Sequence, residues 1–340
     1  MIPDAEGARP TLEEAALEES AQEAAEALAQ PGPGAPPSEV PVVEPGGWKF
    51  TLAGGLLRTA RPRQWLKNVL VLAAPGAAGI PIRPGTVAPI LGAVAAWCLV
   101  SSGTYFLNDA MDVTADRLHP RKRLRAVAAG LVPVRTAKAM AVFLLAAGIG
   151  LPSAWGAYGV SAVIATYAAV TISYSLWLKD EPVIDLAAVA SGFVLRAISG
   201  GIAAGVPISN WFLIVASFGS LFMVAGKRHA EHVDLRDDRG AHRATLAEYS
   251  LGYLRYVRSV SSSVAIAGYC LWAFEKADAA GGSFVFKLSI VPFVIAILRY
   301  GLLLDAGRGG APEEVVLGDR TLQVLGLIWV ALFAVGVYVG

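Results

Sequence analysis

The amino-acid sequence predicts an all-α, polytopic membrane protein with nine transmembrane helices. Three observations support this class. Of the 340 residues, 55% are hydrophobic and only 16% are charged, whereas soluble domains have about one quarter charged residues. Apolar stretches long enough to cross a hydrocarbon layer of about 30 Å recur along most of the chain. Lys and Arg are concentrated in alternate loops between these stretches, as the positive-inside rule requires.

The first segment, residues 1–47, differs from the rest of the chain in charge. It holds ten acidic residues and one base, Arg9, which leaves 27 bases and 17 acids in residues 48–340. The segment is rich in Ala, Glu, Pro and Gly and cannot build an apolar core. We therefore expect a disordered acidic tail at 1–47 and a membrane domain at 48–340. Because the tail has no apolar stretch typical of a cleavable signal peptide, the first membrane helix is expected to direct insertion.

Nine apolar segments are predicted to cross the membrane. The first is short and is interrupted by Pro75. The predicted spans are 64–80, 86–107, 134–151, 155–177, 183–204, 208–226, 252–274, 284–304 and 320–339.

Loop charge orients these spans. With the tail in the cytoplasm, the bases fall mainly in cytoplasmic segments, which favours nine spans with the C-terminus outside. Two of these segments, 108–133 and 227–251, are long and densely charged. They are four helices apart, so a bundle of two four-helix halves plus one helix would place them face to face.

The segment after the second span begins with an acidic motif. Asp109, Asp112 and Asp116 are spaced i, i+3 and i+7, which places them on one face of a helix. Three carboxylates on one face repel one another unless a cation lies among them. Oxygen ligands favour Mg²⁺, which commonly also bridges to phosphate. The motif therefore predicts a Mg²⁺–diphosphate site, with a solvated helix end as the simpler alternative.

Bases and amides near this motif offer further contacts to a diphosphate. Lys122 and Arg125 follow the motif and are expected to contact phosphate. Gln64, Lys67 and Asn68 share a helical face at the entry to the first span, where polar groups are costly and usually functional. The bases also fit a simpler role in setting membrane topology.

Later spans carry two further polar clusters at their cytoplasmic ends. Arg196 lies near mid-membrane on the fifth span, where we expect it either to pair with a group on another helix or to line the cavity. His229 and His232 lack a third ligand of fixed spacing, so we interpret them as ordinary loop histidines. The clusters consist of Tyr174, Lys179 and Asp185 around the fourth and fifth spans, and of Lys227, Arg228 and Glu231 at the end of the sixth.

These motifs resemble those of the UbiA superfamily of intramembrane prenyltransferases. The resemblance rests on Asn108-Asp-x-x-Asp-x-x-x-Asp116 and on Tyr174-Ser-x-x-Leu-Lys179, and it covers about residues 58–340. It implies nine helices around a central cavity under a cytoplasmic cap, with a prenyl diphosphate bound through Mg²⁺ at two Asp-rich motifs. The second motif is replaced here by Lys227-Arg-His-Ala-Glu231, which is better suited to a metal-free phosphate.

Longer motifs are similar to one branch of that superfamily, the decaprenyl-phosphate phosphoribosyltransferases of actinobacteria. This resemblance implies a Mg²⁺-dependent pentosyltransferase of the cell membrane, with its active site facing the cytoplasm. Such an enzyme moves 5-phosphoribose from phosphoribosyl pyrophosphate to a polyprenyl phosphate, releasing pyrophosphate, in the synthesis of the arabinose donor for the cell wall. The matching motifs are Arg61-Pro-Arg-Gln-Trp-Leu-Lys-Asn68, the Asp motif with His119-Pro120, Ser191-Gly-Phe-x-x-Arg196-Ala-Ile-x-Gly-Gly201, Ser220-Leu-Phe-Met-Val-Ala-Gly-Lys-Arg228, Leu271-Trp-Ala-Phe-Glu275 and Pro292-Phe-x-Ile-Ala-Ile-Leu-Arg299-Tyr300.

The resemblance also implies roles for individual residues. Asn108, Asp109 and Asp112 would hold Mg²⁺. Lys227 and Arg228 would bind either the donor's 5-phosphate or the lipid phosphate, and both assignments stay open. The expected catalytic residues are Asp109, Asp112, Lys227 and Arg228, and the expected substrate-binding residues are Gln64, Lys67, Asn68, Asn108, Asp116, Lys122, Arg125, Tyr174, Lys179, Asp185, Lys227, Arg228 and Glu231.

Two other functions remain as alternatives. A UbiA-type prenyltransferase with an aromatic acceptor would need the second Asp-rich motif. A transporter would place its ionisable residues near the membrane midplane, whereas here they are concentrated at one membrane face. The sequence indicates no nucleic-acid partner, and a homo-oligomer stays open.

Overall fold

The computed structural model of the chain describes residues 51–80, 83–119, 122–234, 244–279, 284–307 and 312–338. The acidic tail predicted at 1–47 lies outside these residues. All described elements belong to one unit, Trp48–Gly340. Every regular element in the described ranges is helical, in agreement with the predicted all-α class.

Eight of the nine predicted spans are long α-helices in the structure. Seven of these are long and apolar enough to cross a membrane. The helix α12 is not among the seven, because its first half carries arginines and a run of serines. The eight helices are α4 (Pro84–Met111), α6 (Val134–Ser153), α7 (Tyr158–Leu176), α8 (Ile184–Ala204), α9 (Asn210–Asp234), α12 (Leu251–Ala279), α13 (Phe284–Asp305) and α15 (Arg320–Tyr338).

The first predicted span, 64–80, is wrong as a continuous α-helix. It is the 3₁₀-helix η2 (Pro62–Leu72) followed by the short α3 (Ala73–Ala77). A 3₁₀-helix rises about 2.0 Å per residue and an α-helix about 1.5 Å, so the two elements together extend about 30 Å. This stretched segment matches the thickness of a hydrocarbon core with few residues.

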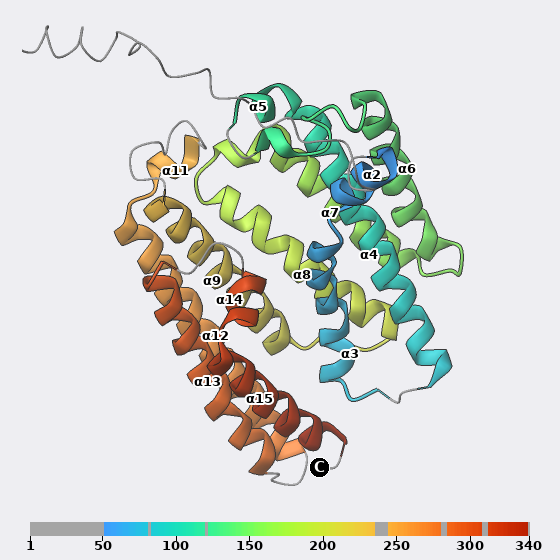
Figure 1. Cartoon of the computed structure of the whole chain (residues 1–340). Helices are drawn as coiled ribbons and strands as arrows, with labels where there is room; N and C mark the ends of the chain where they lie inside the picture. Colours follow the sequence, from blue (N-terminus) through green and yellow to red (C-terminus); the bar gives the residue numbers. More distant parts are fainter. Residues whose placement is uncertain are drawn as a thin grey trace, which may run out of the picture. The chain divides into compact units, whose positions relative to one another are not determined.

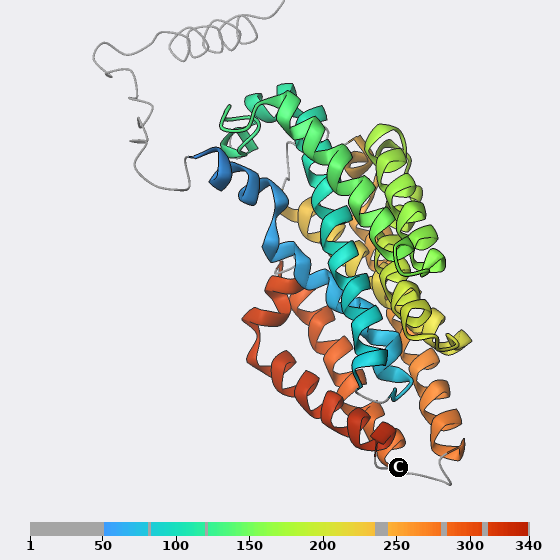
Figure 2. The same cartoon turned by 90° about the vertical axis from the view of Figure 1, so that its right-hand side faces the viewer.

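The long helices pack in two groups that follow chain order. The helices α4, α6, α7 and α8 form the first group, and α9, α12, α13 and α15 form the second. Contacts between α8 and α9 join the groups, and η2 and α3 lie against α8 (Figure 1; Figure 2 gives the view from the side). Short elements connect or precede the long helices: α2 (Leu52–Ala60), α5 (Val113–Leu118), η3 (Lys122–Leu124), η4 (Leu178–Asp180), α11 (Ala244–Glu248) and α14 (Pro312–Gly318).

Close contact between η2 and α8 depends on glycine. A Cβ atom added at Gly200 would lie 1.7 Å from the carbonyl oxygen of Val71. Nearby, the buried Arg196 donates to Asn68 Oδ1 at 2.8 Å and to Ser101 Oγ at 3.1 Å. The partners of Arg196 outside its own helix are therefore neutral side chains. The hydrogen bond to Asn68 holds η2 against the first group of helices.

Candidate functional site

The predicted acidic face is divided between two helices. The helix α4 ends at Met111, Asp112 lies at the junction with φ −87° and ψ 6°, and α5 follows. Asp109 and Asp116 are buried, whereas Asp112 is exposed. The prediction of one continuous helix through the three aspartates is therefore wrong, because α4 ends before Asp112 and α5 begins after it.

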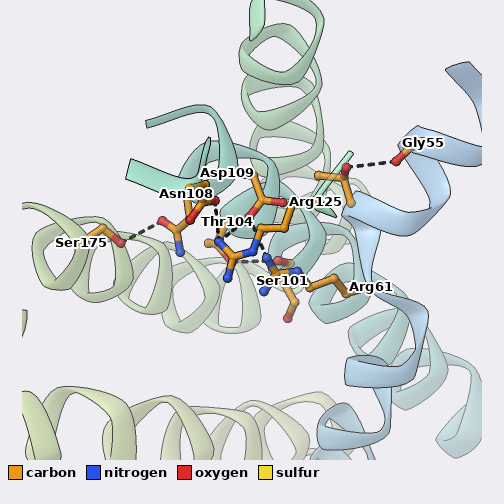
Figure 3. A network of polar contacts seen from close by, with 10 residues as sticks. Gly55, Arg61, Ser101, Thr104, Asn108, Asp109, Arg125 and Ser175 are labelled. Carbon is orange, nitrogen blue, oxygen red and sulfur yellow. Dashed lines mark hydrogen bonds and ion pairs between the residues drawn. The ribbon is translucent and has the colours of Figure 1, made fainter. Parts of the chain in front are cut away.

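Two arginines connect the buried carboxylates, and we call this group the open network (Arg61, Asp109, Asp116 and Arg125). Arg61 donates to Asp109 Oδ1 at 2.6 Å. Arg125 donates to Asp116 Oδ2 at 2.8 Å and approaches Asp109 Oδ1 at 3.4 Å (Figure 3). Both arginine side chains are 31% exposed, against 3% for either aspartate. The network is therefore open to ligands on its arginine side.

A pocket of about 260 Å³ lies beside the open network. It is lined by Arg58, Arg61, Asp109 and Arg125, with Leu124 and Ala126 among its other walls. Neither Arg58 nor Arg61 is among the site residues expected from the sequence. Since loop bases that set topology and bases that bind a ligand look alike in a single sequence, only the fold separates them.

A second group of charged residues is enclosed, and we call it the closed network (Tyr174, Asp185, Arg228, Glu231 and Tyr249). Arg228 donates to Asp185 at 3.0 Å, to Glu231 at 2.8 Å and to Tyr174 at 3.2 Å. The Tyr249 hydroxyl donates to the other oxygen of Asp185. The side chain of Arg228 is 3% exposed and that of Asp185 is 0% exposed.

Consecutive residues at the end of α7 connect the two networks. Ser175 donates to Asn108 Oδ1 at 2.8 Å, next to Asp109 on α4 (Figure 3). The preceding residue, Tyr174, accepts from Arg228 on α9. The ends of α4 and α9 therefore lie on either side of the end of α7.

The other predicted site residues have varied surroundings. Asn68 is buried and uses its amide to contact Arg196 and Cys98. Lys227 is 44% exposed and lies 3.8 Å from Glu231. Gln64, Lys67, Lys122 and Lys179 are half-buried, and none of them lines the pocket beside Asp109.

The interpretation of His229 and His232 as loop histidines is wrong. The helix α9 continues to Asp234, eight residues beyond its predicted end, and both histidines are buried on it. The predicted span ends too early because the charged run that begins at Lys227 ends the apolar signal, while the helix itself continues.

Oxygen ligands for a cation are available at the end of α4. Within the described ranges, no three His, Cys, Asp or Glu side chains are grouped so that they could hold a metal ion. Mg²⁺ needs fewer protein ligands, since it usually keeps several waters and binds one or two carboxylates together with substrate phosphates. Asp109 and the amide oxygen of Asn108 are of the right chemical type, so the residues fit Mg²⁺ bound together with a phosphate ligand.

Comparison with known proteins defines the class. The UbiA prenyltransferase family model matches residues 69–318, and with the seven apolar helices it identifies an integral membrane protein with a UbiA-type fold. The chain belongs to the UbiA prenyltransferase family. Similar relatives include the decaprenyl-phosphate phosphoribosyltransferases of Corynebacterium glutamicum, which is 46% identical over 85% of this chain and 88% of the relative, and of Mycolicibacterium smegmatis, which is 44% identical over 84% and 93%.

Solved structures support the same fold. A UbiA homolog from Archaeoglobus fulgidus bound to DMAPP and Mg²⁺ superposes with a TM-score of 0.65 at 17% identity, covering 83% of this chain and 97% of that one. The same homolog bound to GPP and Mg²⁺ gives a TM-score of 0.63 over 83% and 98%. At this identity the likeness concerns the fold.

Proposed function

We propose that the chain transfers 5-phosphoribose from phosphoribosyl pyrophosphate to a polyprenyl phosphate and releases pyrophosphate. The observation that carries the proposal is the pairing of an acidic end of α4 with a basic end of α9 across Tyr174 and Ser175. One side suits a metal-bound diphosphate and the other a second phosphate. The names of the relatives, decaprenyl-phosphate phosphoribosyltransferase, support the same transferred group and acceptor.

The acidic end of α4 would hold the leaving group. Mg²⁺ bound by Asn108, Asp109 and Asp112 would neutralise the charge that grows on pyrophosphate. Arg125 lies against Asp109 and Asp116, so it is placed to contact the same phosphates. Lys122, one turn before Arg125, would add a further positive charge on this side.

The basic end of α9 would receive the lipid phosphate. Lys227 is 44% exposed and is therefore available to an incoming anion. Arg228 is engaged by Asp185, Glu231 and Tyr174, so we assign it the role of positioning the end of α9. A phosphate oxygen of the acceptor would form the bond to ribose C1 while the C1–pyrophosphate bond breaks. Since the acceptor is already an anion, no strong general base is needed.

We also propose the finer topology of the fold. The eight long helices and the stretched η2–α3 segment would make nine membrane crossings. The helix ends that carry the two networks lead into the segments after α4 and α9, which are rich in Lys and Arg. By the positive-inside rule, this favours the cytoplasmic side of the membrane for these helix ends. The segments after α4 and α9 would form a cap over the site. The cell membrane is the expected location, since the proposed acceptor is a membrane lipid.

A direct assay tests the proposed function. The purified protein is incubated with labelled phosphoribosyl pyrophosphate, polyprenyl phosphate and Mg²⁺, and the label is expected in a lipid product that requires both the acceptor and the metal. Absence of this product, together with transfer from a prenyl diphosphate to an aromatic acid, would contradict the proposal and favour the prenyltransferase alternative.

A further inference from the structure

The pocket of about 260 Å³ beside Asp109 is lined by three arginines, Arg58, Arg61 and Arg125. The proposed function gives a phosphate contact to Arg125 only, so the charges of the other two are without a role. We propose that this pocket binds a phosphate monoester. If the proposed function holds, on which this step rests, the pocket is the subsite for the 5-phosphate of the donor. The phosphate that Lys227 receives is then the lipid's.

The charge of the pocket favours an anion. Three guanidinium groups and one carboxylate line it. Arg58 donates to the carbonyl oxygen of Leu124 at 3.0 Å and has no carboxylate partner among the described residues. A guanidinium has five N–H donors, so the three arginines keep donors beyond those that contact Leu124, Asp109 and Asp116. Arginine forks match the oxygens of a phosphate dianion.

The walls of the pocket are held in place by α2, which sequence reasoning did not predict. A Cβ atom added at Gly55 would lie 2.8 Å from Val132 Cγ2, so α2 packs closely on the segment that follows η3. Thr59 is buried and donates to the Gly55 carbonyl oxygen at 3.0 Å. These contacts place Arg58 over Leu124.

The backbone at Arg61 is unusual and directs its side chain. Arg61 ends α2 with φ 52° and ψ 61°, in the left-handed region that non-glycine residues rarely adopt. Such strain persists where the surroundings require it and is frequent at ligand sites. Here the turn brings the guanidinium to Asp109 at 2.6 Å and over the ring of Tyr105, with 4.6 Å to the centroid.

The position of the pocket identifies the phosphate. Its wall at Asp109 is shared with the acidic end of α4, where the pyrophosphate is expected. Phosphoribosyl pyrophosphate carries a diphosphate and a phosphate monoester on one sugar ring, so it can fill both places. A prenyl diphosphate carries no phosphate monoester apart from its diphosphate, so it cannot fill both places.

Two separate ligands test the assignment by direct binding. Ribose 5-phosphate and pyrophosphate are titrated calorimetrically into the purified full-length protein with Mg²⁺. For Arg58→Gln we expect the affinity for ribose 5-phosphate to fall about 10-fold or more relative to wild type, since a charge-assisted hydrogen bond is lost. The affinity for pyrophosphate should stay within about twofold of wild type. In the lipid assay, the KM for phosphoribosyl pyrophosphate should rise about 10-fold with a smaller change in kcat.

The matched control is Arg63→Gln, which removes an exposed charge that does not line the pocket and should leave both affinities as in wild type. The pocket assignment fails if wild type does not bind ribose 5-phosphate, if Arg58→Gln binds it normally, or if pyrophosphate is weakened equally. Arg58-dependent binding of ribose 5-phosphate without any labelled lipid product would uphold the pocket and reject the proposed function.

Discussion

The open and closed networks use the same chemistry in different surroundings. Each pairs a buried aspartate with an arginine from a distant part of the chain. In the open network the arginines are 31% exposed and line a pocket. In the closed network Arg228 is 3% exposed and contacts three side chains. A buried ion pair with all its bonds made fixes helices in place, whereas arginines with donors left over can bind a ligand.

The difference in exposure indicates different roles for the two networks. The closed network joins α7, α8 and α9 with Tyr249, two residues before α12 begins. The open network lies where α4, the segment after η3 and the turn after α2 meet. We therefore expect substitutions in the closed network to reduce stability first, and substitutions in the open network to reduce substrate binding or turnover first.

The largest effect is expected for Arg228→Met. This change leaves Asp185 buried without its cation, and breaking a buried pair in this way costs about 3–5 kcal/mol. The apparent unfolding temperature in detergent should fall strongly. By contrast, Arg61→Met, whose side chain is 31% exposed, should cost about 1 kcal/mol or less. The double variant Asp185→Asn/Arg228→Gln should be more stable than Arg228→Met, and equal losses for Arg228→Met and Arg61→Met would contradict the comparison.

The second effect concerns turnover. Asp109→Asn keeps the shape of the side chain but removes the charge that contacts Arg61 and Arg125 and that is proposed to hold Mg²⁺. We expect transfer to the lipid to fall about 100-fold or more, since the metal and its carboxylate stabilise charge on the leaving group. The control is Asp278→Asn, an aspartate that is 77% exposed. Wild-type turnover in Asp109→Asn would remove the metal assignment.

Sequence reasoning found the elements whose signal is local. The eight long helices coincide with predicted apolar spans, and the acidic motif at Asn108–Asp116 is found from residue spacing. The contact between Arg228 and Asp185 joins residues 43 positions apart, and no pattern in a single sequence pairs them. The stretched η2 was also missed, because hydropathy records apolar content and not the rise per residue.

Two arginines show why local signals cannot assign roles. Arg196 was noted as a mid-membrane charge in need of a partner, and its partners are Asn68, Ser101 and the rings of Trp97 and Tyr167. Neutral partners of this kind leave no charge pattern to search for. Arg58 has no site signal in the sequence, since its place in the pocket depends on how α2 packs.

The third effect tests the close contact between α8 and η2, the 3₁₀-helix that includes Lys67 and Asn68. In Gly200→Ala the new Cβ atom would lie 1.7 Å from the Val71 carbonyl oxygen, so η2 must move away from α8. Overpacking of this kind costs about 1–3 kcal/mol, and a lower unfolding temperature is expected. In Gly326→Ala on α15, no atom lies within 4 Å of the added Cβ, so this control should be unchanged or slightly more stable. A stable Gly200→Ala variant would show that η2 is free to shift.

The smallest effect is a pH dependence within the closed network. Burial raises the pKa of the Tyr249 hydroxyl, and its hydrogen bond to Asp185 raises it further. The folded state therefore keeps a proton that the unfolded state loses above about pH 10. The contribution of Tyr249 to the free energy of unfolding should then be constant at lower pH and fall as the pH rises above this value. Tyr249→Phe should lower the unfolding temperature slightly at pH 7 but flatten its alkaline decline. Tyr256→Phe, at a side chain that is 64% exposed, should decline as wild type does. An alkaline decline in Tyr249→Phe as steep as in wild type would remove Tyr249 from the closed network.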